Sequence, residues 1–317
     1  MVAVKAPFPW FGGKRKVAPL VWRAFGGVVN YVEPFFGSGA VLLGRPSRWS
    51  GPETINDKDM FVANFWRALQ ADPEAVAHHA DWPVNEADLE ARHQWLVNDG
   101  RALLSRGMGD PRWYDAEIAG WWVWGQCSWI GSNWCGGQGG GWRWSADNGW
   151  TTGGSAGTGV NRKLPHLGDA GAGVNRQRVD LHAYMRTLAD RLRGVRVCCG
   201  DWSRVCGPSP TFKHGLTGVF LDPPYAAERS DCYAVESMDV SADVREWCLS
   251  NGDNPLLRIA LCGYEGEHEL PLSWRCVEWK AAGGYGSQGE ARGRENSHKE
   301  RIWFSPACIP EDQMVLL

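Results

Sequence analysis

The sequence, 317 residues long, lacks the features of membrane proteins, of secreted disulfide-rich domains and of zinc proteins. It contains no run of about 18 apolar residues, and the stretch from Met1 to Trp10 has no signal-peptide core. Its 10 cysteines are scattered and form no CxxC pair, which is neither zinc-ligand spacing nor a compact disulfide framework. We therefore expect a cytoplasmic protein without a metal and without a membrane partner.

Two loops that bind nucleotides in other proteins are missing as well. No Gly-Lys-Ser or Gly-Lys-Thr of a phosphate loop occurs, which disfavours an ATPase. The turn Gly37-Ser38-Gly39 has Leu42 where the third glycine of a dinucleotide-binding GxGxxG would stand. A dinucleotide-binding fold is therefore disfavoured too.

The net charge is only −3, so the total charge does not indicate nucleic-acid binding. Its distribution is uneven, because residues 60–120 hold ten acids and five bases whereas residues 121–200 hold nine bases and four acids. A local basic face can bind phosphates in a chain that is acidic overall. A solvated surface with unevenly placed charges would give the same counts.

A buried strand is predicted over 218–221, where apolar residues run directly into Asp222, Pro223 and Pro224. Neither proline has an N–H, so the strand stops there. Asp222 is thus delivered at the carboxyl end of a strand, where open α/β sheets bind their ligands. The alternative is a strand and a Pro-Pro turn with an incidental aspartate.

The same pattern recurs at three other predicted strands, over 28–32, 53–57 and 195–199. Acids stand at or just after the ends of all four strands: Glu33, Asp57, Asp201 and Asp222. Further strands are predicted over 257–262, 274–280 and 301–304. We therefore predict an α/β fold with a doubly wound, Rossmann-like parallel sheet and a ligand site at its carboxyl edge. A helix-capping role remains an alternative for Asp57.

Two glycine turns precede predicted helices. Glu33-Pro34-Phe35-Phe36-Gly37-Ser38-Gly39 exposes backbone N–H groups to a nucleoside-bearing ligand, and Glu33 favours a cationic or hydroxyl-rich one. Near the start of the chain, Gly12 and Gly13 allow close backbone approach, and Lys14 supplies a cation. Trp10 offers an aromatic face there, although a core position would suit a tryptophan equally.

The alternation of strands and helices breaks between residues 72 and 178. Helices with polar connections are expected over 72–120, and eight of the chain's 20 tryptophans follow between 121 and 150, mixed with glycines. Aromatic side chains flanked by Arg143, Arg162 and Lys163 suit a surface that stacks on bases or wedges between them. A small subdomain packed around tryptophan is the alternative, and both can hold at once.

The chain resembles the Dam-type (D12 class, α-group) DNA adenine N6-methyltransferases of bacteria and phages in an ordered set of motifs. In order, these are the residues around Trp10 and Lys14, the turn from Glu33 to Gly39, Asp57, Gly200-Asp201-Trp202 and Asp222-Pro223-Pro224-Tyr225. The resemblance spans residues 7 to 225 and extends to the last strands. It implies a site-specific DNA-methyltransferase of the kind found in restriction-modification systems, acting on double-stranded DNA. It also implies a catalytic domain over 1–71 and 179–317 and a target-recognition domain inserted over 72–178.

The resemblance also implies roles for single residues. Trp10 and Lys14 would contact S-adenosylmethionine (SAM), and the turn containing Glu33, Phe35, Gly37 and Gly39 would cradle its methionine part. Asp57 would hold the ribose, Asp201 and Trp202 would border the adenine of SAM, and Asp222 would face both SAM and the target base. The chain departs from the family at Trp202, where phenylalanine is expected, and in the Trp- and Gly-rich insert.

The chemistry accounts for these residue types. The adenine N6 lone pair is delocalised into the ring, and hydrogen bonds to Asp222 and the Pro223 carbonyl would localise it. The methyl group would then transfer in line, without a metal, while Tyr225 stacks on the flipped base. A cytosine C5 enzyme needs a Pro-Cys nucleophile, which is absent. A cytosine N4 or RNA amino-methyltransferase and a catalytically inactive DNA-binding relative remain alternatives.

Overall fold

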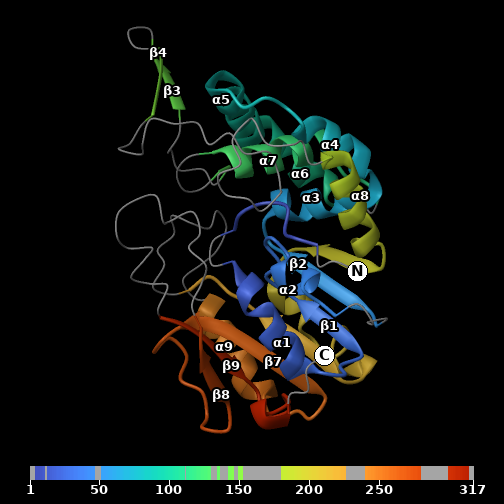
Figure 1. Ribbon diagram of the computed structural model, residues 1–317, viewed down its shortest axis with the longest axis vertical. Helices are drawn as coiled ribbons and strands as arrows, with labels where there is room; N and C mark the ends of the chain where they lie inside the picture. The colour runs from blue at the N-terminus through green and yellow to red at the C-terminus, as the bar shows by residue number, and fades with distance from the viewer. Residues whose placement is uncertain are drawn as a thin grey trace.

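The computed structural model describes residues 4–10, 13–46, 51–110, 112–129, 134–135, 142–145, 149–152, 180–225, 240–279 and 299–313. These residues form a seven-stranded sheet with helices on both faces, a further layer of helices and a separate two-stranded hairpin (Figure 1). None of the helices in these ranges combines the length and the apolar character that crossing a membrane requires.

The large sheet has the strand order β5-β2-β1-β6-β7-β9-β8. The strands are β1 (Asn30–Glu33), β2 (Glu53–Asp57), β5 (Val195–Cys199), β6 (Thr217–Leu221), β7 (Leu257–Tyr264), β8 (Arg275–Glu278) and β9 (Glu300–Phe304). The first five in spatial order run parallel, and β9 lies antiparallel between β7 and β8. Strand order reverses between β1 and β6, which is where a doubly wound sheet binds its ligand.

The sequence predicts these strands because each combines β-branched and apolar residues with a turn signal. Strands β2 and β5 begin and end at the predicted residues, and β6 extends one residue further towards its amino end. Every residue of β6 is buried, as expected for the centre of a parallel sheet covered on both faces. The predicted α/β sheet is confirmed.

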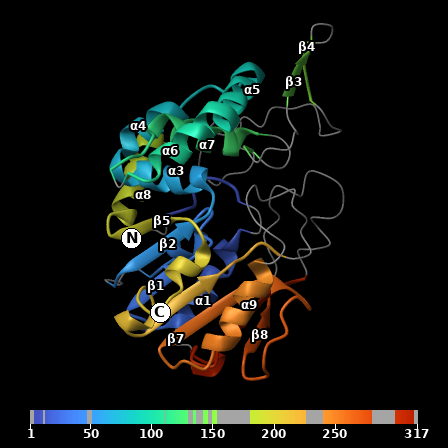
Figure 2. The ribbon, with the colours of Figure 1, turned by 180° about the vertical axis from the view of Figure 1, so that it is seen from behind.

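Helices cover both faces of the sheet (Figures 1 and 2). On one face lie α1 (Ala18–Phe25), α2 (Ala40–Leu43), α3 (Met60–Ala71) and α8 (Leu181–Leu192), whose apolar residues share a core with Tyr31 and Phe220. On the other face, α9 (Val240–Asn251) and the 3-10 turn η3 (Trp202–Val205) pack with Val32, Val219 and Leu221. Neighbouring residues of β1 and β6 therefore point to opposite cores.

Beyond α3 and α8 lies a second helical layer (Figure 1). It consists of α4 (Pro73–Ala80), α5 (Glu86–Trp95), the π-helical turn η2 (Leu96–Gly100), α6 (Arg101–Gly107) and α7 (Ala116–Ser128). Helix α7 packs on α3 and α4, and α4 packs on α8. Asn64 of α3, fully buried, donates to the Asp115 carbonyl and accepts from the Asp115 N–H at 2.8 and 2.9 Å. The second layer thus shares one hydrophobic core with the sheet side of the molecule.

Four tryptophans of the Trp-rich stretch are internal. Trp122, Trp124, Trp129 and Trp134 are buried in the shared core, and Trp134 donates from Nε1 to the Trp122 carbonyl. A buried indole cannot stack on a base, so for these four the Trp-packed alternative is correct and the base-stacking interpretation is wrong.

The separate hairpin pairs β3 (Trp142–Ser145) with β4 (Gly149–Thr152) in antiparallel fashion. Arg143 stands opposite Thr151 in the register. The hairpin extends past the helical layer beside α5, which β3 contacts (Figures 1 and 2). Arg162 and Lys163 lie outside the described residues.

Candidate active site

Four acids gather at the carboxyl edge of the parallel strands, as the sequence predicts. Glu33 ends β1, Asp57 ends β2, and Asp222 follows β6 directly, so these three come from neighbouring strands. Asp201 lies two residues after the end of β5. The strands that carry Glu33 and Asp222 flank the point where strand order reverses, so this pair stands at the expected ligand position.

Lys14 forms an ion pair with Asp222. Its Nζ lies 2.9 Å from Asp222 Oδ1, and the two side chains are 6% and 19% exposed. Burial alone would lower the pKa of Lys14, but the negative charges of Asp222 and Glu300 raise its pKa instead. The short 3-10 turn η1 (Lys14–Lys16) therefore places a permanent cation next to the Asp222 carboxylate.

The contacts of the Asp222 carboxyl fall on one of its two oxygens. Burial raises its pKa, whereas Lys14 and the Tyr225 hydroxyl lower it. Within the described part of the chain, both side-chain contacts of Asp222 fall on Oδ1: Lys14 at 2.9 Å and the Tyr225 hydroxyl at 3.2 Å. Oδ2 is thus available to accept a hydrogen bond.

Tyr225 is held from three sides and is 5% exposed. Its hydroxyl lies 3.0 Å from Glu300 Oε2, and its ring meets the edge of Tyr264 with centroids 4.6 Å apart. Lys14 Nζ lies 5.2 Å from the ring centre. The proposed stacking of Tyr225 on a base would therefore have to occur on a ring that the protein already packs closely.

The turn after β1 is shaped for close contact. Gly37 and Gly39 have φ of 47° and 70°, which L side chains rarely adopt. A Cβ added at Gly37 would lie 2.4 Å from Trp10 Nε1, so Trp10 packs directly on this turn. The Gly37 carbonyl accepts from Trp66 Nε1 at 3.0 Å, and its N–H donates to Asp57 at 2.9 Å.

Asp57 links the glycine turn to the next helix. Its Oδ2 accepts from the Gly37 N–H and its Oδ1 from the Asp59 N–H, both at 2.9 Å. Asp59 in turn caps α3 by accepting from the Phe61 N–H. Burial and the charge of Asp59 raise the pKa of Asp57 to about 7, although the backbone donors oppose the shift.

The remaining predicted residues differ in how much of each side chain is already engaged. Glu33 is 2% exposed, accepts from the Tyr31 hydroxyl at 2.7 Å, and has its pKa raised by burial. Phe35 stacks on Trp202 with centroids 6.1 Å apart. Asp201 caps the turn η3 by accepting from the Ser203 N–H at 3.0 Å, so its carboxylate has a structural role.

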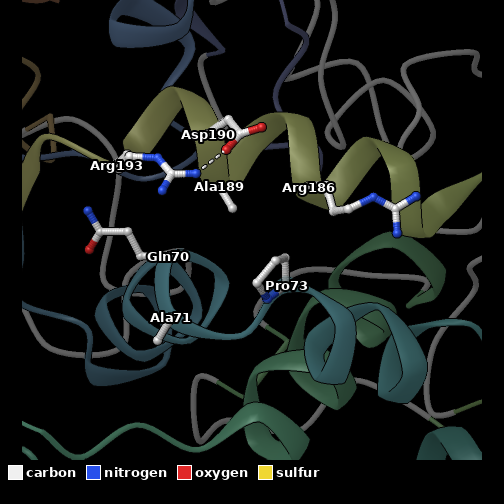
Figure 3. A pocket seen from close by; sticks show the side chains of 7 residues that line it. All are labelled: Gln70, Ala71, Pro73, Arg186, Ala189, Asp190 and Arg193. Carbon is white, nitrogen blue, oxygen red and sulfur yellow. Dashed lines mark hydrogen bonds and ion pairs between the residues drawn. The ribbon is translucent and has the colours of Figure 1, made fainter.

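A groove elsewhere on the molecule contains none of these residues. It lies between the turn from α3 to α4 and helix α8, lined by Gln70, Ala71, Pro73, Arg186, Ala189, Asp190 and Arg193 (Figure 3). Its charges are largely paired within the chain, since Arg193 contacts Asp190 and Arg186 contacts Glu74, each at 2.5 Å. The strand ends therefore remain the candidate site. Within the described ranges, no group of three or more His, Cys, Asp or Glu could hold a metal ion.

A comparison with known protein families agrees with this geometry. Residues 10–94 match the family model of D12 class N6 adenine-specific DNA methyltransferases. The family is a SAM-dependent one, and the match supports adenine methylation of DNA. No curated protein matches the chain.

The D12 class match includes Trp10, Lys14, Glu33, the glycine turn and Asp57. Asp222 lies outside it, so its assignment rests on its own position after β6. Sequence reasoning missed Glu300 and Trp279, which the structure places near Lys14. Glu300 is a single acid at the start of an apolar strand. An acid at an exposed strand end gives the same sequence pattern, so the sequence alone does not single out Glu300.

Proposed function

We propose that the protein methylates adenine N6 at a specific sequence in double-stranded DNA, with SAM held at the ends of β1 and β2 and the flipped adenine at Asp222. The observation that carries this proposal is Asp222 itself. It is a carboxylate at the point of strand reversal, paired with Lys14 through Oδ1 and keeping Oδ2 as an acceptor.

The residues at the ends of β1 and β2 fit SAM. Trp10 fills the space beside Gly37, so Trp10 and the glycine turn would border the ligand together. Asp57 is an acceptor of the kind that holds ribose hydroxyls at the end of a second strand. Glu33 and Asp222 place carboxyl oxygens beside this position, and SAM supplies the methyl group when bound.

In the proposed mechanism, Asp222 Oδ2 and the Pro223 carbonyl accept hydrogen bonds from the two N6 hydrogens. These bonds localise the lone pair on N6 and fix the amino group for in-line attack. As the new carbon–nitrogen bond forms, the bond from the methyl group to sulfur breaks, and N6 then loses one proton to Asp222. Until that proton transfer, Lys14 balances the charge of Asp222, so the carboxylate is ionised at the start of the reaction even when water is excluded.

We assign target recognition to residues 72–178. Support comes from the hairpin β3 and β4, which extends past the helical layer and carries Arg143, and from the basic residues Arg162 and Lys163. These three belong to the nine bases that, against four acids, make residues 121–200 net positive, whereas residues 60–120 are net negative. A basic surface in this segment would contact DNA phosphates and orient the duplex. The proposed activity also implies an intracellular location, where DNA and SAM are present.

The test is to express the chain in a host that lacks DNA methylases and to sequence the host DNA with detection of modified bases. The expected result is N6-methyladenine at one short sequence motif. The variant Asp222→Asn is the matched control, because asparagine keeps the size of the side chain, and it should give unmodified DNA. N4-methylcytosine would identify the alternative amino-methyltransferase, and unmodified DNA from a wild-type protein that binds SAM would identify an inactive relative.

A further inference from the structure

Glu300 is a buried acid for which the mechanism above has no use. It opens β9, is 3% exposed, and stands opposite Tyr264 in the register with β7. Burial raises its pKa, and the charge of Lys14 opposes that shift. Taking a carboxylate out of water costs several kcal/mol, and an apolar side chain would avoid that cost. Such a residue beside a reacting centre indicates a functional constraint.

The contact that Glu300 makes is directed at the active site. Within the described residues, the side-chain partner of its carboxyl is the Tyr225 hydroxyl, 3.0 Å from Oε2. The same hydroxyl lies 3.2 Å from Asp222 Oδ1. A phenol has one proton, so Glu300 and Asp222 compete for it. Glu300 has the shorter distance.

We infer that Glu300 is a positioning residue for methyl transfer, which holds the Tyr225 hydroxyl and so keeps Asp222 a strong acceptor for the substrate amino group. This inference rests on the proposed function. When the Tyr225 hydroxyl donates its hydrogen bond to Glu300, the electron density of Asp222 remains available to the amino group. Without Glu300, the hydroxyl donates to Asp222, and this hydrogen bond weakens Asp222 as an acceptor for the amino group.

The variant Glu300→Met tests this role, since methionine has a similar length and no acceptor oxygen. Single-turnover methylation at saturating SAM and DNA should fall by about tenfold or more, equivalent to about 1.4 kcal/mol of barrier. The Kd for SAM should stay within about twofold of wild type. Glu300→Gln restores an acceptor oxygen and should recover most of the rate.

A double-mutant cycle shows whether the effect passes through the hydroxyl. In a Tyr225→Phe background, Glu300→Met should change the rate by less than about threefold, because the shared proton is already gone. A purely structural role of Glu300 would instead give additive losses. Glu278→Met, an exposed acid on the neighbouring strand β8, is the matched control and should keep the wild-type rate.

Each outcome decides the inference. A wild-type rate in Glu300→Met, or full additivity in the cycle, overturns it while leaving the proposed function in place. A wild-type protein that methylates no DNA overturns the proposed function, and the role of Glu300 in methyl transfer is then rejected with it. A loss confined to variants that retain the Tyr225 hydroxyl supports it.

Discussion

The pKa of Asp57 predicts how SAM affinity depends on pH. Burial and the neighbouring Asp59 raise that pKa to about 7, so Asp57 is mostly protonated at pH 6 and mostly ionised at pH 8. A carboxylate that holds two ribose hydroxyls must offer two acceptor oxygens, which the protonated form does not. SAM affinity should therefore increase as the pH rises through about 7.

The size of the effect follows from the fraction of Asp57 that is ionised. That fraction is about 9% at pH 6 and about 91% at pH 8, and the apparent Kd scales with its inverse. The Kd for SAM should thus be about tenfold lower at pH 8 than at pH 6, a difference of about 1.4 kcal/mol. Isothermal titration calorimetry at a series of pH values, with constant ionic strength, measures it directly.

Two variants isolate the contribution of Asp57. In Asp57→Asn the site has no ionisable group at that position, so its affinity should be weaker and should lose the tenfold dependence. Asp59→Asn keeps a good helix cap but removes the charge that raises the pKa of Asp57, so the midpoint should move to lower pH. Equal pH dependence in wild type and Asp57→Asn would falsify the assignment of Asp57 to the ribose.

Three further predictions concern charge. Lys14→Met should weaken SAM binding more than DNA binding. It should also move the acidic limb of the pH–rate profile to higher pH, because Lys14 lowers the pKa of Asp222. An acidic limb at the wild-type pH would contradict the ion pair. Glu53→Ala removes the carboxylate that pairs with the partly buried Arg45 and Arg191. The free energy of unfolding, measured with urea, should fall by about 3–5 kcal/mol, and an unchanged midpoint would refute this. Neutralising Arg162 and Lys163 together should flatten the dependence of log DNA affinity on log salt by up to about 0.9 per lost phosphate contact, with SAM binding intact. An unchanged slope would mean that neither residue contacts a DNA phosphate.

The sequence was informative where one strong local signal sets the structure. Strands such as β2 and β6 end at an acid or at prolines, and these signals define both the strand and the position of the acid. The glycine turn is equally local, because the positive φ of Gly37 and Gly39 requires glycine.

Contacts between distant segments could not be predicted in this way. The pairing of Lys14 with Asp222 joins residues more than two hundred positions apart, and no periodicity predicts it. Glu300 reaches Tyr225 because β9 inserts between β7 and β8, a topology that the strand signals alone do not give. The base-stacking alternative is wrong for Trp122 and Trp124 for a similar reason, since a helix that is apolar on all sides is identified as a core helix only when α3 and α4 are seen to cover it.

Helix α3 constrains how this enzyme could be re-engineered for a new target sequence. Its first turn is capped beside Asp57, and its middle exchanges two hydrogen bonds with the backbone of Asp115 through the buried Asn64. A chimera that takes residues 72–178 from a relative keeps Asn64 but replaces the segment that satisfies it. An unsatisfied buried amide costs about 1–3 kcal/mol, and this one would lie on the helix next to the proposed SAM site. Graft boundaries placed after α7 would retain this contact and still transfer the segment that carries the hairpin.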